Sequence, residues 1–118
     1  MKIERFEEIK AWQKARILTA EIYDIFGKSS DYGFSNQICR ASVSIMNNIA
    51  EGFERHTKKE FTHFLFIAKG SCGEVRSMLY LAKDLNRISE TQFNQLFQMT
   101  EECSKMLSGL IKYLRKTN

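Results

Sequence analysis

The sequence predicts an all-α protein: an antiparallel up-down-up-down four-helix bundle, with one domain spanning residues 1–118. Three observations predict this class. The chain has no proline and only six glycines, which are too few for the frequent turns of a β-sandwich. Apolar residues recur every three or four positions through four long segments, which is the period of an amphipathic helix. The breaks between these segments are short, which favours antiparallel neighbours.

The first two helices are expected over residues 7–27 and 31–54, with a break rich in glycine and serine between them. The apolar stripe of the first is Ala11, Ala15, Leu18, Ile22 and Ile25. The stripe of the second is Phe34, Ile38, Ala41, Ile45, Ile49 and Phe53.

Two capping boxes predict where the other two helices begin. Thr57 followed by Glu60 opens a helix over residues 58–86, and Ser89 followed by Gln92 opens the last one. The third stripe is Phe61, Leu65, Ala68, Cys72, Val75, Leu79 and Ala82. The fourth is Phe93, Leu96, Thr100, Cys103, Leu107, Leu110 and Leu114.

The third and fourth helices carry additional apolar residues beside these stripes. They are Phe64, Ile67, Met78, Leu81, Leu85 and Ile88 in the third, and Met99, Met106 and Tyr113 in the fourth. Such residues indicate either a wide core face or a contact between subunits, and the pattern favours neither.

The charge is distributed unevenly, although the net value is only +4. Four of the 18 basic residues lie in residues 105–118, which hold no acid, and the remaining 14 match the 14 acids elsewhere. Cations at a helix C-terminus complement the helix dipole, which is one interpretation. The other is a surface that attracts phosphate.

Two basic clusters are the candidate nucleic-acid-binding sites. Arg55, Lys58 and Lys59 surround the turn into the third helix, where two lysines oppose the helix dipole. The second cluster is Lys112, Arg115 and Lys116. In an up-down-up-down bundle the start of the third helix and the end of the fourth lie at the same end. The alternative is that both clusters are ordinary solvated surface.

A polar stripe along the second helix faces polar residues that interrupt the third. The residues of this predicted polar network are Gln37, Arg40, Ser44, Asn48, Glu51, Ser71 and Glu74. A buried carboxylate needs a partner, so we expect Arg40 to pair with a semi-buried Glu74. Its expected role is to fix helix register. A fully solvated stripe is the alternative.

No constellation of residues predicts catalysis, a metal site or a cofactor. His56 and His63 are seven residues apart and lack companion ligands. Cys39, Cys72 and Cys103 lie on or beside apolar faces, which indicates packing. The odd cysteine count without a CxxC pair favours reduced thiols and a cytoplasmic protein. We expect no signal peptide and no membrane span.

The segment QICRASVSIMNNIAEG, residues 37–52, resembles the core motif of a bacterial family. These are the four-helix-bundle proteins encoded by open reading frames in intervening sequences of large-subunit ribosomal RNA genes. The sequence WQKA at residues 12–15 resembles the family's opening motif. The pairs at residues 60–61, 64–65, 67–68 and 70–71, with Glu74, resemble its third helix. The match covers nearly the whole chain.

The resemblance implies a closed ring of four-helix-bundle subunits, a pentamer in known relatives, with a basic surface that binds nucleic acid. One relative is the accessory variability determinant of diversity-generating retroelements, which implies a reverse transcriptase as a possible partner. Two positions depart from the family pattern. Cys39 replaces a usual arginine, and Met46 replaces a usual proline that would kink the second helix.

These observations predict a non-enzymatic, oligomeric nucleic-acid-binding or ribonucleoprotein accessory protein, with RNA or DNA as partner. The alternative is a protein-interaction scaffold with no nucleic-acid role. An enzyme using Arg40 and Glu74 is a third class, which the residues disfavour. A salt-dependent binding assay separates the first two, because phosphate binding weakens steeply with salt.

Overall fold

Each of the four amphipathic segments forms one helix in the computed structural model, which describes residues 2–117. The helices are α1 (Lys10–Phe26), α2 (Tyr32–Phe53), α3 (Lys58–Asp84) and α4 (Glu90–Lys116). A short 3₁₀ turn, Phe6–Glu8, precedes them, and no strand occurs among the described residues. The predicted all-α class is therefore confirmed.

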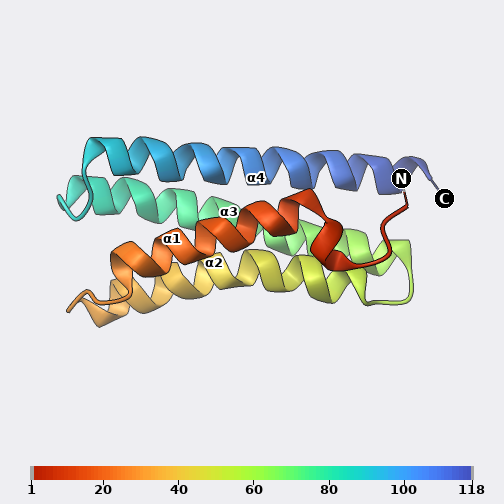
Figure 1. Cartoon of the computed structure of the whole chain (residues 1–118), viewed down its shortest axis with the longest axis horizontal. Helices are drawn as coiled ribbons and strands as arrows, with labels where there is room; N and C mark the ends of the chain where they lie inside the picture. Colours follow the sequence, from red (N-terminus) through yellow and green to blue (C-terminus); the bar gives the residue numbers. More distant parts are fainter. Residues whose placement is uncertain (1, 118) are drawn as a thin grey trace.

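The helices run alternately up and down along a bundle of 47 × 22 × 19 Å (Figure 1). Each helix packs against two others: α2 lies between α1 and α3, and α4 lies between α3 and α1. The α2–α3 turn and the C-terminus lie at one end of the bundle, and the other two turns lie at the opposite end (Figure 1). This arrangement is the predicted four-helix bundle.

The N-terminal segment differs from the prediction, because α1 begins at Lys10 and not at Glu7. Ile9 has an extended backbone (φ −74°, ψ 121°) and is 3% exposed, so its side chain enters the core without continuing the helix. The 3₁₀ turn before it places the Phe6 ring edge-on to Trp12, with 5.2 Å between ring centroids. Packing of these apolar side chains therefore favours a turn over a helix that would begin at residue 7.

Side-chain caps determine where three helices begin. The Asp31 carboxylate accepts a backbone N–H of the first turn of α2 over 3.3 Å. Thr57 accepts the N–H of Glu60 over 3.0 Å. Ser89 and Gln92 form a complete capping box, with bonds of 3.0 and 2.9 Å. At Thr57 the Glu60 carboxylate instead accepts the threonine hydroxyl, so only half of the predicted box forms there.

The C-terminus of α3 comes two residues earlier than predicted, at Asp84. Asn86 adopts a left-handed backbone with φ 58°. The N–H of Arg87 then bonds the carbonyl oxygen of Ala82 over 2.8 Å, and the N–H of Asn86 bonds that of Lys83 over 3.0 Å. Asparagine tolerates the left-handed conformation better than most residues, which explains why the helix stops here.

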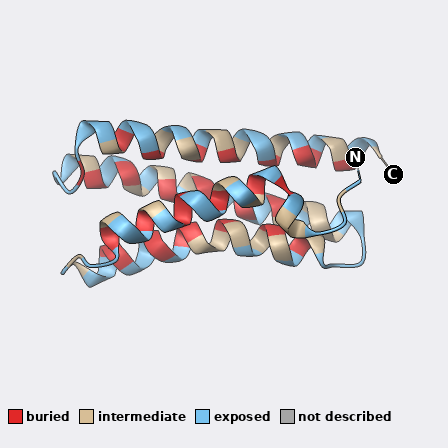
Figure 2. Ribbon diagram, in the orientation of Figure 1, coloured by how far each residue is buried: buried red, intermediate tan, exposed pale blue. Residues whose placement is uncertain are grey.

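The four predicted stripes meet along the bundle axis and form one core, visible as the buried positions in Figure 2. Its fully buried members include Leu18, Ile45, Leu79 and Leu107. Buried hydroxyls bond backbone carbonyls: Thr19, for example, bonds the carbonyl of Ala15 in α1 and that of Ser42 in α2. Among residues 2–117, no buried side-chain nitrogen or oxygen lacks a partner. None of the described helices is long and apolar enough to cross a membrane.

Candidate nucleic-acid interface

The two predicted basic clusters lie at the same end of the bundle, where the α2–α3 turn meets the end of α4 (Figure 1). A direct contact joins the two segments, because the Lys58 ammonium donates to the carbonyl oxygen and, over 3.1 Å, to Oγ1 of Thr117. The antiparallel topology thus brings together residues more than fifty positions apart.

The first cluster carries less free positive charge than its sequence predicts. Arg55 forms an ion pair with Glu60 at 3.5 Å and a longer one with Glu51 at 4.0 Å. Its guanidinium also lies over the Phe64 ring, 4.9 Å from the centroid. Lys59 is exposed, and no ion pair joins it to any described residue. Lys59 is therefore the member of this cluster most available to an anion.

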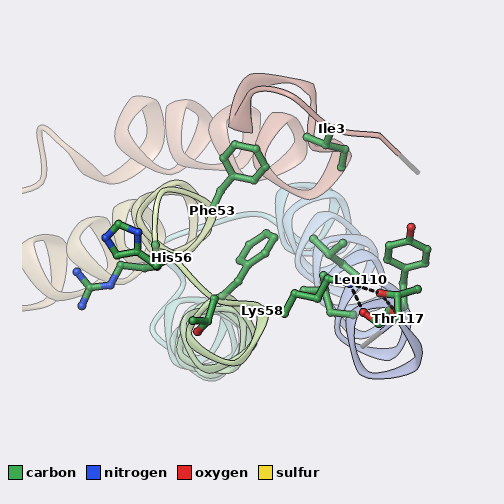
Figure 3. Close-up of a pocket in the computed structure, with 11 residues that line it drawn as sticks. Ile3, Phe53, His56, Lys58, Leu110 and Thr117 are labelled. Atoms are coloured by element: carbon green, nitrogen blue, oxygen red, sulfur yellow. Dashed lines mark hydrogen bonds between the residues drawn. The ribbon is translucent and has the colours of Figure 1, made fainter.

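A hollow of about 300 Å³ opens beside the first cluster (Figure 3). Its apolar wall includes Phe53 of α2, Phe61 of α3 and Leu110 of α4, and its polar rim includes His56 and Lys58. The N-terminal segment closes one side with Ile3. The hollow is thus built from all the segments that meet at this end.

The second cluster lines a groove of about 420 Å³ between α3 and α4. Lys112, Arg115 and Lys116 come from α4, and Phe66 and Lys69 come from α3. The Arg115 guanidinium lies 5.0 Å from the centroid of the Phe66 ring. None of the described residues that line this groove is acidic. The groove therefore carries four basic side chains that no described lining residue neutralises.

Sequence reasoning missed Phe66 and Lys69 as part of this surface. Phe66 belongs to neither apolar stripe of α3, and its 43% exposure confirms that the core does not take it up. Lys69 lies one turn further along the same face. The sequence does contain a signal for this surface. It is a large aromatic residue outside the core stripes, followed three residues later by a lysine.

Part of the predicted polar network forms at the α2–α3 interface. The Ser71 hydroxyl of α3 donates to the Ser44 hydroxyl of α2 over 2.9 Å. The Asn48 amide donates to the same hydroxyl over 2.9 Å and to the Ser44 carbonyl over 2.7 Å. These three residues link the two helices at a half-buried position, which suits a role in helix register.

The expected pair between Arg40 and a semi-buried Glu74 is wrong. Both side chains are exposed, and no ion pair joins them within the part of the chain that the structure describes. Glu74 instead accepts the Gln37 amide over 3.4 Å at the edge of the helix pair. Because the carboxylate reaches solvent, it needs no buried cation. Glu51 is likewise exposed and lies with Arg55, away from this network.

The three thiols are buried, which makes them packing groups. Cys103 donates weakly to the Ala11 carbonyl over 3.7 Å. A hydrogen bond with Cys72, together with burial, raises the pKa of the Cys103 thiol far above its usual range. Burial also raises the pKa of Cys39. Cys103 and Cys39 therefore stay protonated and are poor nucleophiles. The same hydrogen bond lowers the pKa of the Cys72 thiol, which is fully buried in the core. The described residues contain no group of three potential metal ligands.

The additional apolar residues of α3 and α4 divide between core and surface. Ile88 is buried, whereas Ile67, Leu81 and Leu85 are 40%, 46% and 47% exposed. By helical spacing these three lie on one side of α3 and of the residue that caps it, Leu85, and we call this side the apolar face of α3. The exposed Glu74 separates Ile67 from the other two. On α4, Met106 is 37% exposed.

Comparison with known proteins agrees with this fold. A solved structure of a protein of unknown function, from the S23 ribosomal protein family of Bacteroides thetaiotaomicron, is similar with a TM-score of 0.82. The two share 24% identity over 86% of this chain and 98% of that chain, which shows the shared fold. No curated protein matches. The family model of the 23S rRNA-intervening sequence proteins matches residues 7–109. The match indicates no enzymatic family, and the chain belongs to the 23S rRNA-intervening sequence protein family.

Proposed function

We propose that this protein is a non-enzymatic, oligomeric nucleic-acid-binding protein that serves as an accessory subunit of a ribonucleoprotein. The observation that carries the proposal is the convergence of two basic clusters at one end of the bundle, where Lys59, Lys112 and Lys116 have no acidic partner among the described residues. Unpaired cations on a common surface are what a phosphate backbone requires.

The oligomer is part of the proposal for two reasons. The apolar face of α3 formed by Ile67, Leu81 and Leu85 is a surface that a second subunit would remove from water. A ring of subunits would also repeat the basic end, so that one strand meets several weak sites at once. Linked weak contacts raise the overall affinity well above that of one site.

Fluorescence anisotropy with labelled RNA and DNA, measured over a range of salt concentrations, tests the proposal. We expect binding at low salt that weakens steeply as salt rises. Lys112→Glu and Lys59→Glu should each weaken binding and flatten its salt dependence. Lys28→Glu is the matched control, because Lys28 lies in the turn at the opposite end of the bundle. Equal losses for all three variants would contradict a site at the basic end.

A protein-interaction scaffold is the second candidate function, and the same apolar face of α3 favours it. It predicts no detectable binding of RNA or DNA by the unmutated protein even at low salt. It also predicts that complexes with a protein partner barely respond to salt, because apolar burial is not screened. Observing both results would replace the nucleic-acid proposal with this one.

A further inference from the structure

We propose that the groove between α3 and α4 binds single-stranded nucleic acid, with a base stacked on Phe66 and phosphates held by Lys69, Lys112 and Lys116. This inference rests on the proposed function and narrows it to a class of ligand and to one face of the molecule. Its basis is the groove of about 420 Å³ that these four residues line together with Arg115.

Phe66 is an exposed aromatic ring without a structural task in the core. It is 43% exposed, while its neighbours Leu65 and Ala68 are fully buried and complete the α3 stripe. The Arg115 guanidinium lies over the ring, 5.0 Å from its centroid, and so covers one face of it. A base would stack on the other face of the ring or on the guanidinium itself, and this pair is the aromatic platform of the groove. Aromatic rings and guanidinium groups are the surfaces on which proteins stack unpaired bases.

The surroundings of Phe66 argue against a contact between subunits. Lysine is depleted from the centres of protein interfaces, because burying an unpaired ammonium is costly. Phe66 lies among Lys69, Lys112 and Lys116, and none of the described residues that line the groove is an acid that would neutralise them.

The geometry also favours a single strand over a duplex. Bases within a duplex are stacked on one another and present no free face to Phe66, whereas an unpaired strand presents one at every nucleotide. Lys112 and Lys116 are one helical turn apart, about 6 Å along α4, and Lys69 projects from the opposite wall. The cations therefore flank the aromatic platform, where the backbone on either side of a stacked base would pass.

The test compares unstructured single strands, of RNA and of DNA, with a hairpin duplex of the same composition by anisotropy at low salt. We expect the unmutated protein to bind the single strands more tightly than the duplex. Phe66→Leu keeps an apolar side chain but loses the stacking surface, and should weaken single-strand binding roughly 5- to 100-fold. Phe66→Trp should retain binding, and the strand should quench its added tryptophan emission. Tyr23→Leu is the control for loss of an exposed aromatic, because Tyr23 is 48% exposed on α1.

The lysines are tested by the salt dependence. Lys69→Gln combined with Lys112→Gln removes two phosphate contacts, so the slope of log affinity against log salt should become shallower by about 1.4. Lys28→Gln, at the opposite end, should leave the slope unchanged. Melting curves and light scattering establish that each variant keeps the fold and the subunit number.

The outcomes separate this inference from the function on which it rests. If the unmutated protein binds neither single strands nor duplex at low salt, the proposed function and this inference both fail. If it binds nucleic acid but Phe66→Leu binds as well as the unmutated protein, or the duplex binds as tightly, only the inference is overturned. A changed subunit number in Phe66→Leu would also overturn it, because Phe66 would then be an interface residue.

Discussion

Gly52 of α2 lies so close to α3 that a side chain there would meet α3, and replacing it tests the packing of the two helices. A Cβ atom on residue 52 would lie 2.6 Å from the Cβ of Phe64 and 3.1 Å from Cδ1 of Phe61. Favourable carbon contacts lie at about 3.5–4.0 Å, so the first approach is about 1 Å too short. Phe64 Cβ is bonded to the backbone and cannot rotate away. Gly52→Ala therefore requires the helices themselves to separate.

The expected cost of Gly52→Ala is about 1–3 kcal/mol, the usual range for overpacking a filled core. For 118 residues the unfolding entropy near the melting temperature is about 0.25 kcal/mol per degree. We therefore expect the melting temperature to fall by roughly 4–12 °C. Replacing a glycine by alanine inside a helix usually raises the stability of the fold. That gain offsets little of the expected loss here, because Gly52 lies in the last turn of α2.

Gly73→Ala and Gly109→Ala are matched controls inside helices, because a Cβ at either position meets no atom within 4 Å. Each should raise the melting temperature by roughly 2–4 °C, corresponding to about 0.5–1 kcal/mol of backbone entropy. The assay is thermal unfolding followed by circular dichroism at one fixed protomer concentration, since oligomer stability depends on concentration. A melting temperature of Gly52→Ala at or above that of the unmutated protein would refute the close packing.

Four further predictions concern single residues and the subunit number. Arg40→Leu should change the melting temperature by no more than about 2 °C, because the side chain is exposed and unpaired among the described residues. Ser44→Ala removes an oxygen that accepts two side-chain hydrogen bonds and should lower the free energy of unfolding by about 1–2 kcal/mol. Equal melting curves for Arg40→Leu and Ser44→Ala would contradict the hydrogen bonds of Ser44 with Asn48 and Ser71 at the α2–α3 interface. The backbone N–H of Phe34 and then the Arg87 guanidinium lower the pKa of Asp31. A lowered pKa means that this carboxylate stabilises the fold above its unfolded pKa of about 3.9 and loses that effect as pH falls through the folded value. Asp31→Asn should accordingly reduce the loss of stability between pH 5 and pH 3, and an unchanged pH profile would contradict the pairing. Light scattering should give a mass several times 13.8 kDa, and a monomer at micromolar concentration would refute the oligomer.

The number of helices, most of their ends and the core follow from local patterns in the sequence. Helical period and capping are local properties, so Ser89 with Gln92 identifies the start of α4 without knowledge of any other helix. The stripe from Leu65 to Ala82 identifies the buried face of α3 for the same reason. The N-terminus of α1 was predicted less well, because the burial of Ile9 depends on the helices around it.

Which polar and charged residues act together depends on how the helices pack in three dimensions. A carboxylate at Glu74 on a packed face would need Arg40 as its partner, but the rotation of α2 against α3 leaves both in solvent. Of the same predicted network, Ser44 and Ser71 do meet. The meeting of Phe66 with Arg115 likewise depends on how α4 packs along α3. The physical reason is that a helical pattern specifies which residues share a face. The angle and offset at which two faces meet follow from packing all four helices around one core, and long side chains at the rim of that contact are free to reach either a partner or water.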